Sequence, residues 1–234
     1  MIRPARSSRA RCPDHGDRAG ARLPLILVAF LVVAFAACSS SDKTSPPSTP
    51  RVLGVGDSLI VLATADIRTA LDAGYETRII AENGQRIDEM LPPLREALGR
   101  DGSVAAVFVN LGTNNVIQHE TYAGALDDLD HLIETVADVP CVVLTTISTF
   151  LDTSFGSALA GRLNAKIRAL REQDSGKYQI VDWDAAIHAP GGVEELMMVD
   201  GVTDGVHENP TAGREWFADE YVEALSRCPR LNRP

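Results

Sequence analysis

The stretch VLGVGDSL, residues 52–59, runs from an apolar segment into a Gly-Asp-Ser turn, and a helical pattern begins directly after the turn. A short apolar run that ends at such a turn is typical of a buried strand in a parallel sheet. In sheets of this kind, ligands bind at the carboxyl ends of the strands. The stretch therefore predicts the first strand of a parallel sheet and places Ser58 at its carboxyl end as a candidate nucleophile.

The same alternation of strand and helix continues to the last helix. Five strands that alternate with helices predict an α/β fold, a three-layer α/β/α sandwich around a five-stranded parallel sheet. No repeat or second linker interrupts this pattern, so we expect one domain over residues 51–234. The predicted strands are 52–56, 76–81, 104–111, 141–146 and 178–181, and the predicted helices are 59–71, 87–98, 122–136, 158–171 and 210–225, of which the second is interrupted early by Pro92 and Pro93.

Residues 1–37 have the composition of an export signal. Six arginines precede an apolar run of thirteen residues, Leu25 to Ala37, which is short for a membrane span. Small residues before Cys38 and serines after it resemble the bacterial lipoprotein signal, in which the cysteine is acylated after cleavage. Phe35 departs from the usual Leu, Val or Ile of that signal, and plain secretion or an uncleaved anchor are the alternatives. Residues 38–50 contain nothing to pack and predict a disordered tether.

These features predict an exported protein. We expect it to be lipid-anchored on the outer face of the bacterial cytoplasmic membrane, or otherwise secreted. Six of the 22 basic residues and two of the 32 acidic residues lie in the first 37, so the remainder carries 16 basic and 30 acidic residues, a net charge of −14. Such a surface disfavours nucleic acid and anionic lipid, so we expect membrane attachment only through Cys38. No cofactor is expected, and no CxxC pair or His/Cys cluster indicates a metal.

Two cysteines remain once the signal is set aside. Cys12 leaves with it, Cys38 is the lipidation candidate, and Cys141 and Cys228 are left. In an exported protein such a pair is a candidate disulfide. Cys141 opens a predicted buried strand and Cys228 lies just past the last predicted helix. The sequence gives no distance between them, so a disulfide and two free thiols stay open as alternatives.

Asp204-Gly205-Val206-His207 stands just before the last predicted helix. A serine hydroxyl is a poor nucleophile until a base takes its proton, and the base works best when a carboxylate fixes its tautomer. Ser58, His207 and Asp204 can supply these three roles. Asp200 is a rival to Asp204, but only Asp204 stands three residues before the histidine.

These segments together resemble the SGNH, or GDSL-type, hydrolase family, and the resemblance covers residues 51–225. Gly-Asp-Ser-Leu at 56–59 matches the block that carries the nucleophile, Ser58, and the segment 204–207 matches the block that carries the base and its orienting aspartate. The resemblance implies a flavodoxin-like SGNH fold and ester hydrolysis through a Ser-His-Asp triad.

The resemblance also implies an oxyanion hole. Attack on an ester carbonyl places negative charge on its oxygen, which preorganised donors must meet. The backbone N–H groups of Ser58 and Gly84 and the side-chain amide of Asn114 match the family's donors. Asn115 replaces the aspartate that usually follows, which generally organises the loop, so the change leaves the catalytic interpretation in place.

Each candidate also has a plainer interpretation. Ser58 could be a helix N-cap, Asn114 a turn residue, and Asp204 and His207 loop residues. All four in this order favour the catalytic interpretation.

Three further residues are weaker candidates. Trp183 follows the fifth predicted strand and could shape a pocket or belong to the core. His119 and His188 could line the mouth of the site, but neither has an aspartate at matching spacing, and exposure on loops explains both better.

The leading hypothesis is an exported serine esterase that removes a short acyl group, such as acetyl, from a sugar or small alcohol. Only 147–157 and 184–209 are long loops, so there is little room for a lid, and a shallow site suits short acyl groups. The first alternative is an acyltransferase acting on cell-envelope glycan. The segments 84–86, 182–183 and 204–213 look like the extracellular SGNH domains of peptidoglycan O-acetyltransferases.

Transfer and hydrolysis share an acyl-enzyme and differ in whether a sugar hydroxyl or water attacks it. No multi-span membrane domain is fused in this sequence, which favours hydrolysis. The second alternative, a non-catalytic lipid-anchored binding protein, conflicts with the intact set of site residues. The expected partner is a small acyl ester or an acylated glycan, and the oligomeric state stays open.

Overall fold

The computed structural model describes residues 49–100, 102–151, 154–229 and 231. The export signal, Cys38 and most of the tether lie outside these residues, so the interpretations of them stay predictions. Five parallel strands form one sheet in the order β2-β1-β3-β4-β5. The strands are β1 (Arg51–Gly56), β2 (Glu76–Ala81), β3 (Ala106–Asn110), β4 (Val142–Thr145) and β5 (Tyr178–Val181).

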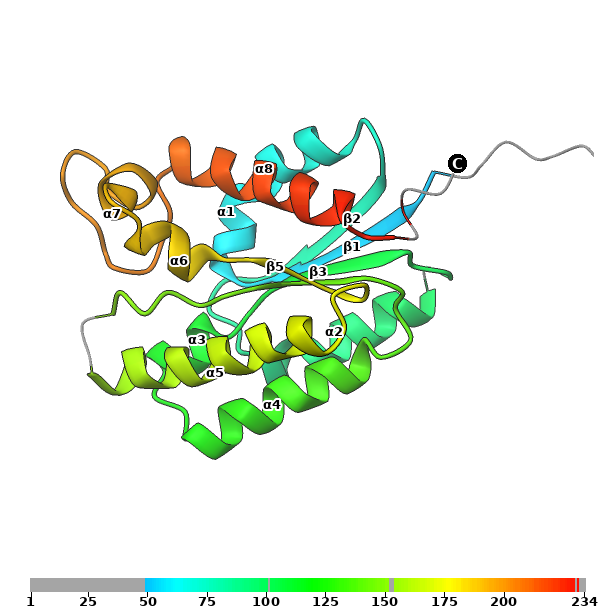
Figure 1. Cartoon of the computed structure of the whole chain (residues 1–234), viewed down its shortest axis with the longest axis horizontal. Helices are drawn as coiled ribbons and strands as arrows, with labels where there is room; N and C mark the ends of the chain where they lie inside the picture. Colours follow the sequence, from blue (N-terminus) through cyan, green and yellow to red (C-terminus); the bar gives the residue numbers. More distant parts are fainter. Residues whose placement is uncertain (1–48, 101, 152–153, 230, 232–234) are drawn as a thin grey trace, which may run out of the picture. The chain divides into compact units, whose positions relative to one another are not determined.

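Helices cover both faces of the sheet, which confirms the predicted α/β/α sandwich (Figure 1). The first and last helices, α1 and α8, pack against each other on one face, and α2, α4 and α5 lie on the other. The helices are α1 (Ser58–Leu71), α2 (Ile87–Arg100), α3 (Thr113–Ile117), α4 (Tyr122–Thr135), α5 (Ser154–Gln173), α6 (Trp183–His188), α7 (Gly192–Leu196) and α8 (Ala212–Ser226).

Alternating side chains of the strands feed two apolar cores, one on each face. In β1, Val52 packs into the core under α1 and α8, whereas Leu53 packs into the core under α2, α4 and α5, as the period of two along a strand requires. A Cβ on Gly54 would lie 2.1 Å from the ring of Phe108. Glycine at this position therefore lets the ring lie flat on the sheet, where it contacts Tyr221 of α8 with ring centroids 4.5 Å apart.

Helix α2 runs without a break through Pro92 and Pro93, so the predicted interruption is wrong. The two prolines remove two backbone donors from the helix. Its apolar stripe, which includes Ile87, Met90 and Leu94, is buried against the sheet. Because tertiary packing supplies most of a helix's stability, this stripe holds the helix together across the prolines.

The sequence did not predict α3, α6 and α7, and it placed the start of α8 two residues early. Helix α8 begins at Ala212 rather than Pro210 because the side-chain oxygen of Asn209 accepts hydrogen bonds from the backbone N–H groups of Thr211 and Ala212. Such an Asx turn competes with the helix for these residues. Pro210 therefore lies in the turn before the helix.

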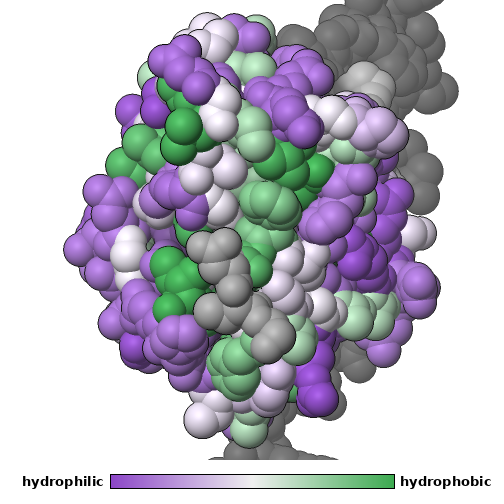
Figure 2. Space-filling view, turned by 90° about the vertical axis from the view of Figure 1, so that its left-hand side faces the viewer, coloured by the Kyte–Doolittle hydropathy of each residue, from purple (hydrophilic) through white to green (hydrophobic). Residues whose placement is uncertain are grey.

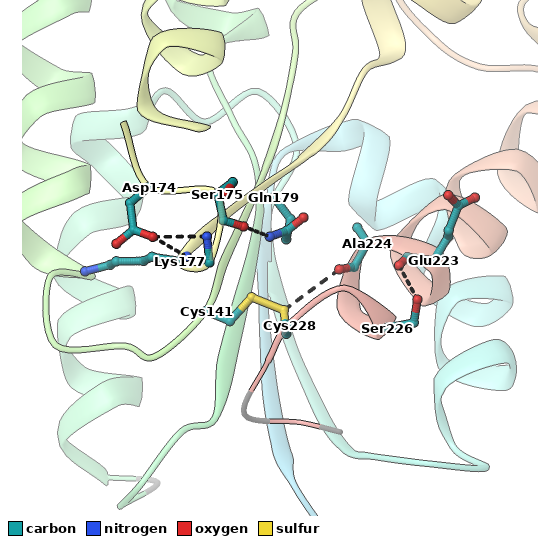
Figure 3. The surroundings of a disulfide bond; sticks show 10 residues. Cys141, Asp174, Ser175, Lys177, Gln179, Glu223, Ala224, Ser226 and Cys228 are labelled. Carbon is teal, nitrogen blue, oxygen red and sulfur yellow. Dashed lines mark hydrogen bonds between the residues drawn. A yellow bond between two sulfur atoms is a disulfide. The ribbon is translucent and has the colours of Figure 1, made fainter. Parts of the chain in front are cut away.

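Cys141 and Cys228 form a disulfide, the first of the two alternatives that the sequence left open (Figure 3). Their Cα atoms lie 5.8 Å apart, although 87 residues separate them along the chain. The bond ties the segment that enters β4 to the turn that follows α8. On the chain-entropy model, closing so long a loop contributes about 4 to 5 kcal/mol to stability.

Candidate active site

Ser58 is the first residue of α1, in the sharp turn at the carboxyl end of β1. The side chain of Asp57 caps this helix by accepting the backbone N–H of Leu59 at 3.2 Å. A Cβ on Gly56 would come within 2.2 Å of Ile60, so glycine is needed for the helix to start this close to the strand. The turn fixes the hydroxyl of Ser58 at the carboxyl edge of the sheet, where it is partly exposed.

The structure brings Ser58, His207 and Asp204 into one chain of hydrogen bonds. The Ser58 Oγ lies 2.9 Å from the His207 Nε2, and the His207 Nδ1 lies 2.6 Å from the Asp204 Oδ2. With Asp204 ionised, Nδ1 carries the ring proton and donates it to the carboxylate. The other ring nitrogen is then the acceptor for the serine hydroxyl, which is the geometry that general-base activation needs.

Backbone groups hold Asp204 in its charged form. Its Oδ1 accepts the N–H of Val206 at 2.9 Å and the N–H of His207 at 2.8 Å. Partial burial raises the pKa of the Asp204 carboxyl, but its hydrogen bonds to His207 and Val206 outweigh this and lower the pKa below its ordinary value. Asp204 and not Asp200 contacts the histidine, because Asp200 is an exposed turn residue with φ of 51°.

The two other oxyanion candidates follow the strands on either side of β1. Asn114 lies in α3, directly after β3, and its Nδ2 donates to the Asp57 Oδ2 at 3.1 Å. An amide NH₂ carries two hydrogens, so this bond orients Asn114 and leaves a second hydrogen for a substrate oxygen. Gly84 lies in the exposed turn after β2 with φ of +76°, and its carbonyl accepts the Gln118 side-chain N–H at 2.7 Å. Gly84 and Asn114 therefore lie on the same edge of the sheet as Ser58.

Asp57 is a buried carboxyl that the sequence interpretation did not single out. Burial raises the pKa of Asp57 to about 7, although the N–H of Leu59, the amide of Asn114 and the nearby His207 act to lower it. Its two oxygens join the helix cap behind Ser58 to Asn114, the candidate oxyanion donor. The one feature of the sequence that could have indicated a role for Asp57 in the site is its place between Gly56 and Ser58.

Glu208 is a second buried carboxyl beside the histidine, and it too was missed. The residue is only 4% exposed, and neither side-chain oxygen has a hydrogen-bond partner among the described residues. The nearest cation is the Arg214 Nε, 3.7 Å away. Burial raises the pKa of Glu208 to about 7, against the opposing charges of Arg214 and His207. A glutamate directly after the histidine gave no hint of this burial.

Asn115 organises the loop that carries Asn114. Its side-chain oxygen accepts the N–H of Ile87 at 3.0 Å, and its amide donates to Glu120 at 2.5 Å and Asp128 at 3.0 Å. Burial and the charge of Glu120 raise the pKa of Asp128 to about 6. An aspartate at position 115 would face two carboxyls without a proton to donate, which accounts for asparagine at this position.

The structure corrects the pocket interpretation of Trp183. Its side chain is 0% exposed and packs against Trp216 and Phe217, with ring centroids 5.2 and 4.7 Å away. Trp183 is therefore a core residue, because the start of α6 turns its ring under α8 rather than toward the rim.

The two weaker histidine candidates are both exposed and have different surroundings. The ring of His119 lies on a groove of about 180 Å³ that Val116, Leu151 and Val206 also line. His188 instead bonds the carbonyl oxygen of Asp184 at 2.8 Å, within α6.

A second cleft, of about 340 Å³, lies beside His207 and is lined in part by Met197, Val202 and Glu208. A third hollow, of about 280 Å³, lies at the opposite end of the sheet, where Arg100 and Val104 line it. Neither Ser58 nor His207 lines that hollow, so the two rim clefts are the relevant ones. Within the described part of the chain, no three His, Cys, Asp or Glu side chains gather into a group that could hold a metal ion.

A parallel sheet covered on both faces, with a serine, a histidine and an aspartate joined at its carboxyl edge, has the architecture of an SGNH-type hydrolase. No protein-family model matches the chain, and no curated protein does. The C-terminal catalytic domain of peptidoglycan O-acetyltransferase A from Streptococcus pneumoniae, with a methylsulfonyl adduct, is 22% identical with a TM-score of 0.62, over 76% of this chain and 93% of that one.

Two esterases are also similar in structure. A catalytic mutant of an acetylxylan esterase from Geobacillus stearothermophilus is 16% identical with a TM-score of 0.59, over 75% of this chain and 94% of that one. A psychrotrophic esterase from Pseudoalteromonas is 17% identical with a TM-score of 0.58, over 79% of this chain and all of that one. The chain therefore has the fold of the SGNH/GDSL hydrolases, as the sequence resemblance implied.

Proposed function

We propose that this protein is an exported serine esterase that hydrolyses short acyl esters through an acyl-enzyme on Ser58. The observation that carries the proposal is the hydrogen-bonded chain from Ser58 through His207 to Asp204, at the edge of the sheet where such folds bind ligands. The similar solved structures support the same reaction class, because esterases and an O-acetyltransferase are among them.

The first half-reaction forms the acyl-enzyme. His207 takes the hydroxyl proton as the Ser58 oxygen bonds to the carbonyl carbon, and the carbonyl oxygen becomes an oxyanion. The amide of Asn114 and the backbone N–H groups of Ser58 and Gly84 stabilise that charge; losing one such donor typically costs about 3 kcal/mol of transition-state stabilisation. The carbon–oxygen bond to the alcohol then breaks, and His207 gives its proton to the leaving oxygen.

Water completes the cycle. His207 takes a proton from water as the water oxygen bonds to the acyl carbon, and the bond to Ser58 then breaks with return of the proton to the serine. Asp204 keeps its charge throughout and stabilises the imidazolium in both halves. The rim groove at His119 holds only about 180 Å³, which suits acetyl-sized groups better than long chains.

Export and lipid anchoring belong to the same proposal. The arginine-rich start, the apolar run and Cys38 support it, and the disulfide fits an oxidising compartment. None of the helices within the described ranges is long and apolar enough to cross a membrane. If Cys38 is acylated, the protein should partition into detergent, and Cys38→Ala should shift it to the soluble or secreted fraction. Unchanged partitioning of that variant would rule out the anchor.

An acyltransferase acting on cell-envelope glycan is the second candidate. The structural similarity to a peptidoglycan O-acetyltransferase domain favours it. The two candidates differ in the acceptor: with a glycan acceptor present, a transferase makes acylated glycan in preference to free acid. A binding protein on the same fold would form no acyl-enzyme at all.

The decisive experiment uses p-nitrophenyl acetate and a fluorophosphonate. Wild-type protein should show a burst of nitrophenol followed by steady turnover, and mass spectrometry should find one phosphonate adduct, on Ser58. Ser58→Ala should abolish both while its circular dichroism and Tm stay unchanged. Retained turnover in the well-folded variant would refute the assignment of Ser58, and faster turnover on addition of glycan would favour transfer.

A further inference from the structure

Residues 199–202 form a tight hairpin at the rim of the site. Val199 and Val202 exchange both backbone hydrogen bonds, with N···O distances of 2.8 and 3.0 Å. The two residues between them, Asp200 and Gly201, have φ of 51° and 79°, and two positive φ values are those of a type I′ hairpin turn. Directly paired residues place their side chains on the same face, so the two valines form one apolar surface.

This apolar surface is exposed to solvent. Val199 is 46% exposed and Val202 is 70% exposed, the highest value among the large hydrophobic side chains that the structure describes as exposed. Ile117 and Phe150, also exposed, lie in segments that follow β3 and β4. Figure 2 shows hydrophobic side chains in a broken band across this face. Because an exposed apolar side chain contributes little to folding, the core does not account for the two valines.

The hairpin is fixed relative to the catalytic histidine. Asn209, two residues after His207, donates its backbone N–H to the Leu196 carbonyl at 2.6 Å and its side-chain N–H to the Met198 carbonyl at 2.5 Å. These two bonds hold the segment that leads into the hairpin. The apolar surface and the imidazole therefore keep one relative position.

Between the hairpin and the histidine lies the cleft of about 340 Å³. Val199 and Val202 supply its exposed apolar lining, and Asp204 and His207 line it beside them; Met197 and Glu208 border it with nearly buried side chains. No lysine or arginine is among its described lining residues. The cleft thus combines an apolar surface with negative charge.

The chemistry of the proposed reaction decides which half of an ester lies here. His207 must give its proton to the leaving oxygen, so the alcohol that carries this oxygen lies on the histidine's side of the acyl carbon. We propose that the cleft between the hairpin 199–202 and His207 binds the alcohol part of the ester, and that it selects a neutral alcohol with an apolar face. This inference rests on the esterase function proposed above.

Anionic alcohols are disfavoured by the same residues. Asp204, which lines the cleft, and Asp200 at the exposed tip of the hairpin repel a carboxylate or phosphate, and like charges brought together without a counter-ion cost free energy. Val199 and Val202 lose contact with water when an alkyl or ring carbon lies over them. Selection therefore acts through both attraction and repulsion.

The test compares esters that differ in one half only. Val202→Asp and Val202→Ser should lower kcat/KM for cyclohexyl acetate about three- to tenfold relative to wild type, because an apolar contact is lost, and should change kcat/KM for ethyl acetate less than about twofold. Val222→Asp on α8, at a residue that is also exposed, is the matched control and should change neither value. Circular dichroism should be the same for all four proteins.

Two results would overturn the inference. The first is a Val202 variant that alters the ratio of ethyl butyrate to ethyl acetate but not that of cyclohexyl to ethyl acetate, which would place the acyl group in the cleft. The second is unchanged selectivity in both Val202 variants. Failure of the proposed function is distinct, since wild-type protein would then hydrolyse none of the esters faster than Ser58→Ala does.

Discussion

At the scale of single residues, Asp204 and His207 contribute to the proposed reaction in different ways. His207 moves the proton, whereas Asp204 orients the ring and stabilises its charge. We therefore predict that His207→Ala lowers kcat by about 10⁴-fold or more, nearly as much as Ser58→Ala, and that Asp204→Ala retains more activity. Steady-state kinetics with p-nitrophenyl acetate should show the losses in kcat rather than KM.

The double variant Ser58→Ala with His207→Ala checks that these residues act as one unit. Members of one catalytic unit are strongly non-additive, so the double variant should be little worse than either single one. Asp200→Ala is the control and should be close to wild type, because Asp200 does not contact the ring. A larger loss from Asp200→Ala than from Asp204→Ala would contradict the assignment of the orienting carboxylate.

The sequence predicts those site residues that stand in recognisable short motifs, and it does not predict the others. Ser58, Asp204 and His207 stand in short segments whose spacing and order carry the chemistry. Asp57 and Glu208 look like ordinary polar residues there. Their raised pKa values come from burial, and burial depends on contacts between segments far apart in the chain.

At the scale of elements, the length of a helix or strand decided whether the sequence could predict it. The five strands and the long helices carry apolar patterns that extend over whole turns or whole strands, and each was found close to its predicted bounds. Helices α3, α6 and α7 have only five or six residues, too few for a helical period to stand out. For a related reason the sequence left a pocket and a core position open for Trp183, since its place after β5 does not reveal which way a short helix turns its side chain.

The contacts of Asn115 join α2 to α3 and α4, and they yield a second prediction. Asn115→Asp should lower the free energy of unfolding by about 1 to 3 kcal/mol, because it removes two donated hydrogen bonds and adds a carboxylate beside Glu120 and Asp128. Urea denaturation at pH 8 measures the loss. Adding Asp128→Asn restores a donor to the pair and should recover most of the stability; no recovery would mean that the acidic neighbours are not the cause.

The disulfide links β4 to α8, and a third prediction concerns its removal. Replacing Cys141 and Cys228 together by alanine should lower Tm by about 10 °C, from the loop that the bond closes. Differential scanning calorimetry measures this shift. A reductant should lower the Tm of wild-type protein and leave that of the double variant unchanged, whereas equal sensitivity of both would contradict a stabilising bond.

At the scale of the whole domain, carboxyls with raised pKa values, Asp57 and Glu208 above all, set the pH dependence of stability. The folded-state pKa values of Asp57 and Glu208 lie at about 7, above ordinary values of 3.8 and 4.5. Between these limits the folded chain binds more protons than the unfolded chain, so stability falls as pH rises through this window. The pKa of Asp204 is lowered, so this group makes stability rise with pH, but only near pH 4 and below. We predict a higher Tm at pH 5.5 than at pH 8.

Glu208→Gln isolates one of the two carboxyls. A neutral amide of the same shape has no charged form to desolvate. The free energy of unfolding of the variant should therefore exceed that of wild type by about 1 to 3 kcal/mol at pH 8, and by much less at pH 5.5. Unfolding at the two pH values measures the difference. Glu194→Gln, at an exposed residue of α7, is the control, and an equal response of both variants would contradict the buried-carboxyl explanation.

The distance along the chain between Ser58 and His207 has a consequence for biosynthesis. The two residues lie 149 positions apart, and the helices that follow them, α1 and α8, pack against each other. A chain still emerging from the ribosome or from a translocation pore has its nucleophile long before its base. Ester cleavage would therefore begin only after the last helix has docked. If Ser58 and His207 act as proposed, a nascent or prematurely terminated chain would cleave no ester.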